Sequence, residues 1–448
     1  MVKCLAELVI RNARLVLPEG IVRGELSVEK GRIHEIAVSG LEKGDKEINA
    51  KDKIVIPGVI DACVHFYTKK SSHREDFHSC SIAAAAGGIT TIIVTPLDKT
   101  TQTTRTVQNL VRAGRKNSII DFAIYASGMG SEFTENASKI ASLGVRSFRV
   151  STEGIDDIEH KALEELMNTV KLLGGIIVTD VGSDGTIHGK IRELRKHGRK
   201  DPLAHVDTRP SEAEEEDVKE IMEGVKHTKC KLHISSVTTR RTCEIISDSK
   251  KKKLKVSTGT CPHFLIFTKK DMTKFGPFLK VDPPLRTDED RLALWNALST
   301  GTIDIVTSDH IPIPREEKEE GWKNIWGAPA GIPGVETLLP LILRKGTAMG
   351  RLTLENVVNI LCTKPAQIFG FYPRKGVISK GSDADLVMID LRQETTVTAR
   401  KFHSKIDWTP YEGLKLKGIP TMTISRGTIL MEDGEVVGKS KRGQFLAA

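Results

Sequence analysis

Strand-like and helix-like stretches alternate eight times between residues 54 and 308, and this alternation limits the possible folds more than any other feature. The strand-like runs are apolar and rich in β-branched residues, and amphipathic stretches long enough for helices lie between most of them. The eight runs are residues 54–65, 90–95, 119–125, 145–150, 175–179, 231–235, 254–258 and 303–308. This pattern predicts an α/β protein and favours a (β/α)8 barrel over a doubly wound sheet.

The two ends of the chain have a different pattern. Residues 1–53 contain short apolar runs separated by turn residues such as Pro18-Glu19-Gly20, and residues 376–448 return to strand-like composition. The termini of one domain often lie close together. We therefore expect residues 1–53 and 376–448 to form one small β-sandwich domain, and residues 54–375 to form the barrel domain.

Composition narrows the class of protein. The 448 residues are 39% hydrophobic and 28% charged, which is typical of a globular enzyme. Basic and acidic residues are interspersed along the chain. With 5% aromatic residues, the net charge of +9 does not indicate nucleic-acid binding. No apolar run is long enough to cross a bilayer, Met1-Val2-Lys3-Cys4 has no signal-peptide pattern, and the seven cysteines form no CxxC pair. We expect a cytoplasmic protein with reduced thiols and no membrane or nucleic-acid partner.

Side chains that bind metals stand at the ends of several predicted barrel strands. The first strand ends with Asp61, Cys63 and His65, which alternation places on one face. The sixth strand carries His233, and Asp309 follows the eighth. Reactive groups of such barrels lie at the C-terminal ends of the strands, and thiolate, imidazole and carboxylate all bind zinc. Each residue also has a structural interpretation, such as a small buried thiol, a core histidine or a helix cap.

Several longer blocks resemble the cyclic amidohydrolases, which include dihydroorotase, allantoinase and dihydropyrimidinase/hydantoinase. The similarity covers nearly the whole chain, and its blocks are residues 57–61 (PGVID), 84–91 (AAAGGITT), 260–263 (TCPH), 281–286 (VDPPLR), 308–310 (SDH), 329–337 (PAGIPGVET) and 381–385 (GSDAD). The PPLR block and residues 408–411 (WTPY) are more similar to dihydroorotase-like members, which act in pyrimidine biosynthesis. The resemblance implies an amidohydrolase-type barrel, a small cyclic amide as substrate, and a homodimer or homotetramer.

The metal ligands of this family are only partly present. Its first strand normally supplies His-x-His, and here it supplies Cys63-x-His65. The fourth strand normally supplies a lysine that is carboxylated and bridges two metals, and Arg149 stands there. Thr179 replaces a histidine of the fifth strand. A guanidinium cannot form a carbamate or bind a cation. We therefore expect Arg149 to pair with a carboxylate such as Asp309 or Asp180.

Four residues remain as potential ligands, and three substrate contacts of the family are altered. The resemblance implies that Cys63, His65, His233 and Asp309 hold at most one zinc ion per subunit, or none, with Asp309 as the catalytic residue. The substrate positions of the family correspond here to Tyr67, Leu97 and Asp282.

These replacements leave three functions open. The first is dihydroorotase-like hydrolysis of a cyclic amide C–N bond with one metal. The second is a catalytically inactive protein with a structural or regulatory role, for example as a partner of aspartate carbamoyltransferase. The third is hydrolysis of an uncharged cyclic amide of the hydantoin or allantoin type.

Overall fold

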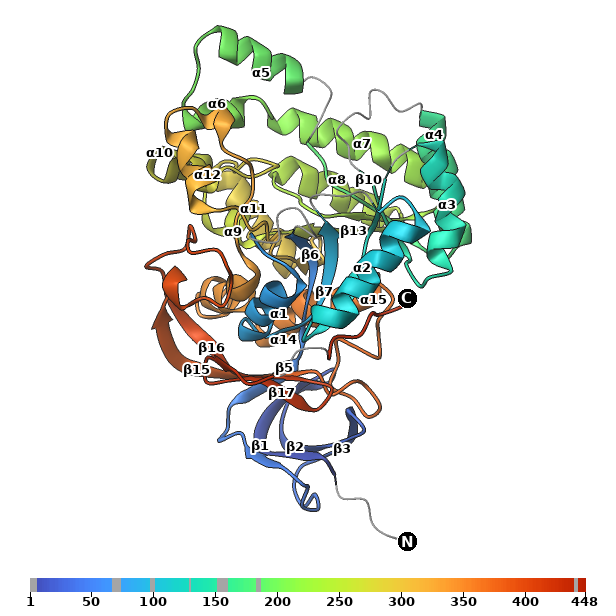
Figure 1. The fold of residues 1–448 in the computed structure, drawn as a ribbon, viewed down its shortest axis with the longest axis vertical. Coiled ribbons are helices and arrows are strands. Elements are labelled where there is room, and N and C mark those ends of the chain that lie inside the picture. The colour runs from blue at the N-terminus through green and yellow to red at the C-terminus, as the bar shows by residue number, and fades with distance from the viewer. Residues whose placement is uncertain are drawn as a thin grey trace.

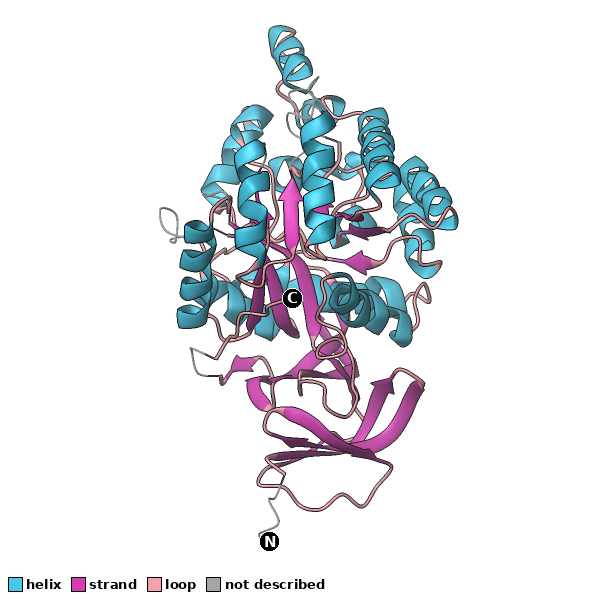
Figure 2. Ribbon diagram, turned by 90° about the vertical axis from the view of Figure 1, so that its right-hand side faces the viewer, coloured by secondary structure: helices cyan, strands magenta, loops and turns pink. Residues whose placement is uncertain are grey.

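The computed structural model has a (β/α)8 barrel with a separate sheet below it, so the predicted fold class is confirmed (Figures 1 and 2). It describes residues 6–66, 74–96, 101–128, 130–150, 160–182, 187–438 and 442–448. Six described cysteines are buried free thiols.

The barrel wall is built from parallel strands at the positions that the alternation predicts. Its strands are β6 (Val59–Phe66), β7 (Ile89–Pro96), β8 (Asp121–Ile124), β9 (Ala126–Ser127), β10 (Ser147–Val150), β11 (Ile176–Thr179), β12 (Lys231–Ile234), β13 (Val256–Thr260) and β14 (Ile305–Val306). The strands β8 and β9 are one barrel strand interrupted at Tyr125. A bridge between Val64 and His310 joins the first strand to the segment after β14 and closes the barrel.

Helices surround this wall (Figure 2), and apolar residues of several of them, such as Val107 of α2 and Val218 of α7, join the core cluster that includes strand residues. They are α1 (Phe77–Ala86), α2 (Thr104–Asn117), α3 (Ser131–Ala141), α4 (His160–Leu172), α5 (Ile187–Lys196), α6 (Pro202–Asp207), α7 (Ser211–Thr228), α8 (Arg240–Lys251), α9 (Pro262–Ile266), α10 (Met272–Phe275), α11 (Asp288–Ser299), α12 (Arg315–Glu319), α13 (Leu338–Ile342), α14 (Leu354–Val358) and α15 (Lys364–Ile368). Short 3-10 or π turns are η2 (Lys269–Asp271), η3 (Gly276–Leu279), η4 (Glu320–Trp322), η5 (Ile325–Gly327), η6 (Val335–Thr337), η7 (Leu343–Thr347), η8 (Asn359–Thr363) and η9 (Ala399–Lys401). Capping boxes at Thr103 and Thr287 fix where α2 and α11 begin.

The two ends of the chain share one curved sheet of nine strands. These are β1 (Leu8–Leu17), β2 (Gly20–Glu29), β3 (Arg32–Ala37), β4 (Glu47–Asn49), β5 (Ile54–Pro57), β15 (Leu386–Thr396), β16 (Lys415–Ser425), β17 (Thr428–Glu432) and β18 (Glu435–Val436). The central contact is the antiparallel pairing of β5 with β15, which joins the N-terminal strands to the C-terminal ones. Apolar residues from both ends of the sheet, including Leu26 and Met422, form its own core.

The C-terminal segment also holds this sheet against the N-terminal end of the barrel. The buried Lys375 Nζ lies 2.6 Å from Asp121 at the start of β8 and 2.5 Å from Asp385 just before β15. Leu446 donates a backbone hydrogen bond to Phe122 and joins the apolar cluster inside the barrel. The opposite, C-terminal end of the barrel carries the candidate site.

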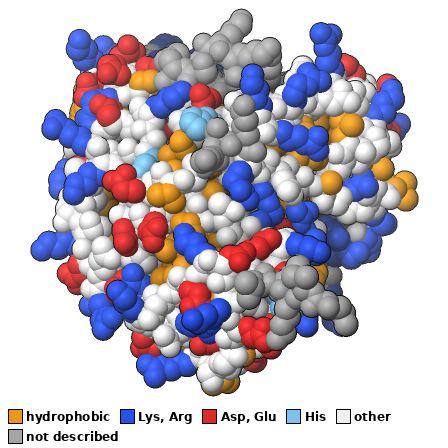
Figure 3. All heavy atoms as spheres, turned by 60° about the horizontal axis from the view of Figure 1, so that its bottom comes forward, with side chains coloured by type: hydrophobic (Ala, Val, Ile, Leu, Met, Phe, Trp, Pro, Cys, Tyr) orange, Lys and Arg blue, Asp and Glu red, His pale blue; other side chains and the backbone are white. Residues whose placement is uncertain are grey.

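The outer surface carries charges of both signs. Figure 3 shows basic and acidic side chains interspersed over most of the face that includes the lower sheet. Within the described part of the chain, no helix has the length and apolarity that a membrane span needs.

Candidate metal centre at the C-terminal end of the barrel

The end of β6 presents Cys63 and His65 inside the mouth of the barrel. Every residue of this strand is buried, and its pairing with β7 shifts register between Asp61 and Val64. This irregularity separates Asp61 from the other two side chains, contrary to the simple alternation expected from sequence. The Asp61 carboxylate instead accepts hydrogen bonds from the backbone of Ser308, at 3.0 Å, and of Cys63, at 3.3 Å. Asp61 therefore ties β6 to the segment after β14.

Three potential ligand atoms form a nearly equilateral triangle at this end. The Cys63 Sγ lies 3.3 Å from His65 Nε2 and 3.4 Å from Asp309 Oδ1. The third side, from His65 Nε2 to Asp309 Oδ1, is 3.5 Å. Tetrahedral zinc with bonds of 2.0–2.3 Å separates neighbouring ligand atoms by roughly 3.3–3.8 Å. The triangle therefore has the size of one face of a tetrahedral zinc site.

The backbone around Asp309 holds this carboxylate in place. Asp309 has a φ of 48°, a conformation that is uncommon for residues other than glycine and that is found often at functional sites. The His65 amide donates to the His310 carbonyl at 2.8 Å. The His310 side chain in turn lies between Glu75, at 2.6 Å, and the Gly334 amide, at 3.1 Å. These bonds hold Asp309 against the end of β6.

The protonation states of Asp309 and Cys63 are compatible with a bound cation. Burial raises the pKa of Asp309, but its hydrogen bond with His65 and the nearby His263 and Arg149 outweigh burial, so the pKa lies below its usual value. Asp309 is therefore ionised at neutral pH. Burial, and then the charge of Asp309, raise the pKa of Cys63 well above its usual value. Cys63 is a neutral thiol in this structure, and a cation bound to its sulfur would release the proton.

Arg149 places a fixed positive charge at the end of β10, where the resemblance predicts a replaced metal position. The Arg149 Nη2 forms an ion pair with Asp180 Oδ2, one of the acceptors expected from sequence, and 17% of the Arg149 side chain is exposed. Burial lowers the pKa of Arg149, but Asp180 and other nearby groups raise it further, so the guanidinium stays charged. The hydroxyl of Thr179 donates to the Asp180 carbonyl.

His233 does not join the triangle. Its Nδ1 lies 3.0 Å from Ser257 Oγ, and its ring packs edge-on against Phe369. Burial lowers its pKa to about 3, so the ring is neutral. Among the groups of potential ligands in the described residues, none whose atoms all lie within 4.8 Å of one another contains His233.

Comparison with known proteins agrees with this architecture. The sequence profile of the Amidohydrolase family matches residues 54–430. The chain belongs to the amidohydrolase family. It is 33% identical to an L-hydantoinase of Paenarthrobacter aurescens, covering 98% of each chain. It is also 33% identical to a dihydroorotase of Methanosarcina mazei, covering 98% of this chain and 97% of the relative.

A solved structure extends this likeness to the fold. The L-hydantoinase (dihydropyrimidinase) from Arthrobacter aurescens superposes with a TM-score of 0.95 at 32% identity, covering 99% of this chain and all of that one. The chain is thus an amidohydrolase of the cyclic amidohydrolase group, whose named members here are hydantoinases, dihydroorotases and allantoinases. The equal identities to a hydantoinase and a dihydroorotase do not favour either.

A second pair of potential ligands faces the same carboxylate of this amidohydrolase. The strand β13 ends just before Cys261, and His263 lies in the first turn of α9. Ligand atoms of Cys261, His263 and Asp309 all lie within 4.8 Å of one another. Sequence reasoning used Cys261 and His263 only as part of a family block. The signal that it missed is their spacing, because Cys261-x-His263 repeats the spacing of Cys63-x-His65.

Of the three predicted substrate positions, one lies in the described part of the chain. Tyr67 and Leu97 fall outside it. Asp282 Oδ1 lies 3.0 Å from Arg209 Nε and 3.3 Å from His205 Nε2. Burial raises the pKa of Asp282, but these partners lower it by more, so the group is an anion. Its side chain is 42% exposed.

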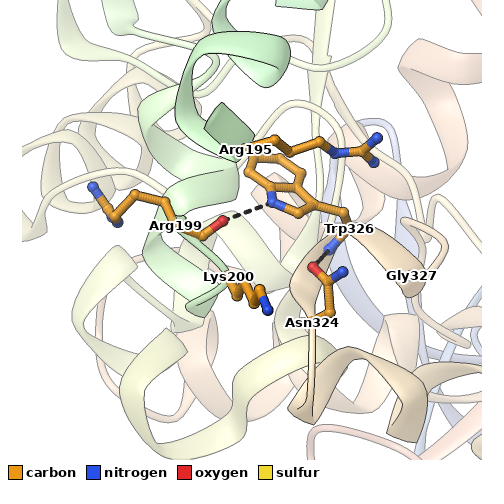
Figure 4. Close-up of a pocket in the computed structure, with 6 residues that line it drawn as sticks. All are labelled: Arg195, Arg199, Lys200, Asn324, Trp326 and Gly327. Carbon is orange, nitrogen blue, oxygen red and sulfur yellow. Dashed lines mark hydrogen bonds between the residues drawn. The ribbon is translucent and has the colours of Figure 1, made fainter. Parts of the chain in front are cut away.

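The pocket in Figure 4 is a separate feature. It has a volume of about 370 Å³ and is lined by Arg195, Arg199, Lys200, Asn324, Trp326 and Gly327. The indole of Trp326 donates to the Arg199 carbonyl at 2.8 Å. Its lining contains no carboxylate, histidine or cysteine, so it offers no base and no metal ligand. The candidate chemistry therefore stays at the end of β6.

Proposed function

We propose that this protein hydrolyses the C–N bond of a neutral cyclic amide with one zinc ion held by Cys63, His65 and Asp309. The observation that carries this proposal is the triangle of their ligand atoms, with sides of 3.3, 3.4 and 3.5 Å. Its donors, a thiol, an imidazole and a carboxylate, are those that zinc prefers. Three protein ligands also leave a coordination position open, as in catalytic zinc sites.

The charges around the triangle support one ion and argue against two. Arg149 replaces a bridging anion with a cation whose partner, Asp180, keeps it in place. A second divalent ion beside this guanidinium would be repelled, and no carbamate is available to bridge the two.

The residues of the site can then be assigned roles. A zinc ion supplies Lewis acidity, which polarises the amide carbonyl and lowers the pKa of water. Asp309, ionised and buried, can accept a proton from the attacking water and return it to the leaving nitrogen. His65, whose Nε2 lies 3.5 Å from Oδ1 of that carboxylate, would hold the ion beside it. The backbone bond from His65 to His310 keeps the two side chains in register.

A neutral substrate is favoured over dihydroorotate. Dihydroorotate carries a carboxylate, and Asp282 brings an anion to a substrate position of the family. Arg209 already pairs with Asp282 and so is not a free cation for a ligand. Similarity to an L-hydantoinase and a D-hydantoinase is compatible with a neutral ring, although the chain is also similar to dihydroorotases.

An inactive protein is the second candidate, and the Arg149–Asp180 ion pair favours it. Such a pair gives stability without a metal, as expected for a protein kept for assembly. In that case the chain would act as a subunit of a homo-oligomer or as a partner of aspartate carbamoyltransferase.

One experiment separates these functions. The purified protein is analysed for metals, reconstituted with equimolar zinc, and assayed with hydantoin, dihydrouracil, allantoin and dihydroorotate, with and without aspartate carbamoyltransferase. We expect one zinc per subunit and turnover of a neutral ring. Asp309→Asn should lower kcat by about 10²–10⁴-fold. Two metals per subunit would contradict the one-metal site, and absence of both zinc and turnover would favour the inactive protein.

The matched comparison is His233→Asn, which keeps a polar group at the position of Nδ1. Because His233 faces Ser257 and not the triangle, we expect its replacement to leave the zinc content at one per subunit. Loss of zinc from this variant would show that His233 is a ligand.

A further inference from the structure

A second pocket is lined by residues of α9, α11 and η7, and it has a volume of about 320 Å³. This volume lies at the lower end of the range of about 300–1,000 Å³ that is usual for small-molecule sites. Three of the lining side chains are cations from separate parts of the chain: Arg291 of α11, Lys345 of η7, and Arg351. No residue of the triangle lines the pocket. It is therefore a cationic pocket distinct from the candidate metal centre.

The two carboxylates that line the pocket already have partners. Asp271 Oδ2 accepts hydrogen bonds from the amide of Thr268, at 2.7 Å, and from its hydroxyl, at 3.0 Å. Asp288 Oδ1 accepts from Nε and Nη2 of Arg291, at 2.9 and 2.6 Å. Within the described part of the chain, no carboxylate pairs with either of the other two cations. The pocket thus contains two positive charges that are not offset by a neighbouring anion.

The guanidinium of Arg351 is held in place but keeps donors to spare. Its Nη1 donates to the Lys345 carbonyl at 3.0 Å, and its central carbon lies 5.1 Å from the centroid of the Trp295 ring. The Trp295 indole is itself fixed by donating to the Leu265 carbonyl at 2.9 Å. Nε and Nη2 of Arg351 have no hydrogen-bond partner among the described residues. A guanidinium with a fixed position and unused N–H groups is suited to binding an oxyanion.

The electrostatics of the pocket support a missing anion. Burial lowers the pKa of Lys345, and the neighbouring guanidinium groups lower it further. Burial, and then the charge of Arg291, also lower the pKa of Arg351. None of the causes is a nearby carboxylate, so nothing compensates the repulsion between these cations. A bound anion would remove that repulsion.

We propose that this pocket binds a phosphate group, either as the free ion or as part of a small phosphorylated metabolite. A phosphate group has several acceptor oxygens and about two negative charges near neutral pH. It can therefore accept from Arg291, Lys345 and Arg351 at once, whereas a carboxylate has only two oxygens to share among them. The proposal is independent of the candidate metal centre, and it holds whether or not the protein is an active hydrolase.

Calorimetric titration of the full-length protein tests this site. Inorganic phosphate and glycerol 3-phosphate are each titrated in about 0.15 M sodium chloride, which screens non-specific attraction. The wild-type protein should bind one phosphate group per subunit. Lys345→Gln and Arg351→Gln should each weaken binding by at least about tenfold, the lower end expected for one charge-assisted hydrogen bond.

Arg344→Gln is the matched control, because it removes the same charge from a neighbouring residue that does not line the pocket. The Arg344 Nε donates instead to the Lys415 carbonyl, at 3.3 Å. We expect this variant to change the dissociation constant by no more than about twofold in the same salt.

The outcomes are distinct. Equal affinity for the two probes would identify the free ion as the ligand, and tighter binding of glycerol 3-phosphate would identify a phosphorylated metabolite; both support the site. Absence of saturable binding of either probe would overturn the proposal. Binding that is unchanged in Lys345→Gln and Arg351→Gln would overturn it as well. If these variants do not fold, phosphate should protect Lys345 of the wild-type protein from acetylation, and equal labelling with and without phosphate would overturn the proposal.

Discussion

Replacing Arg149 with Met tests whether this arginine has become a structural element of a former metal site. Its guanidinium pairs with Asp180, and the two side chains are 17% and 29% exposed. Methionine keeps the apolar stem and removes the charge. The carboxylate of Asp180 then loses its partner in a partly desolvated site.

The expected magnitude follows from this intermediate burial. Removing one partner of a fully buried pair costs about 3–5 kcal/mol, and a fully exposed pair contributes about 0–1 kcal/mol. Since both side chains are mostly but not completely covered, we expect Arg149→Met to lower the free energy of unfolding by about 2 kcal/mol. Asp180→Asn should cost less, about 1 kcal/mol, because Asp309 still stabilises the cation.

A double-mutant cycle in urea measures the pair itself. Arg149→Met, Asp180→Asn and the double variant should give a coupling free energy of about 1–2 kcal/mol. Arg146→Met is the control, because Arg146 forms no ion pair with any residue in the described ranges. A coupling energy within about 0.3 kcal/mol of zero, or an Arg149→Met variant as stable as the wild type, would refute the structural role of this pair.

Three further predictions concern pH, substrate and metal content. Burial lowers the pKa of His233 to about 3 in the folded protein, against about 6.5 for an exposed histidine, so the unfolded chain binds more protons at mildly acidic pH. The contribution of His233 to stability should therefore fall as the pH drops below about 6.5, by about 2 kcal/mol at pH 5. This loss should be absent from His233→Asn in urea titrations at pH 7 and 5. Asp282→Asn should raise kcat/KM for dihydroorotate relative to hydantoin by about tenfold, because it removes an anion; an unchanged ratio in paired assays would count against the neutral-substrate argument. A triple variant should bind two metal ions per subunit instead of one; it combines Cys63→His, Arg149→Lys and Thr179→His. If elemental analysis still shows one ion, these three positions are not what excludes the second.

The fold could be predicted from the sequence because it depends on repeated, local patterns of apolar and polar residues. Most residues of the eight apolar runs are buried, with exposed exceptions such as Lys231 and Lys255, and parallel strands buried on both faces give such apolar runs. The ends of individual strands could not be predicted in the same way: within the strand-like residues 376–448, the turn at Arg426 and Gly427 separates β16 from β17.

The candidate site could be predicted from the sequence only in part, because its geometry depends on a register shift and on contacts between distant strands. Cys63, His65 and Asp309 were predicted together, and the structure brings them together. Asp61 was placed with them by simple alternation, and the irregularity in β6 moves it to the backbone of Ser308. No spacing rule predicts where a strand slips by one residue. Such a slip turns the side chains beyond it to the opposite face of the sheet.

The charges of Arg149, Asp180 and Asp309 together support the proposed position of one ion. Arg149 makes the β10 side of the barrel mouth positive, and Asp180 neutralises it without offering the ion a free ligand. Under the proposed function, a cation would bind on the side of Asp309 where Cys63 and His65 form a face of tetrahedral size. Asp309 also lies within 4.8 Å of a ring nitrogen of His263, whose buried Nε2 lacks a partner among the described residues. Under the proposed function, Cys63, His65 and Asp309 thus provide a position for one ion next to the fixed charge of Arg149.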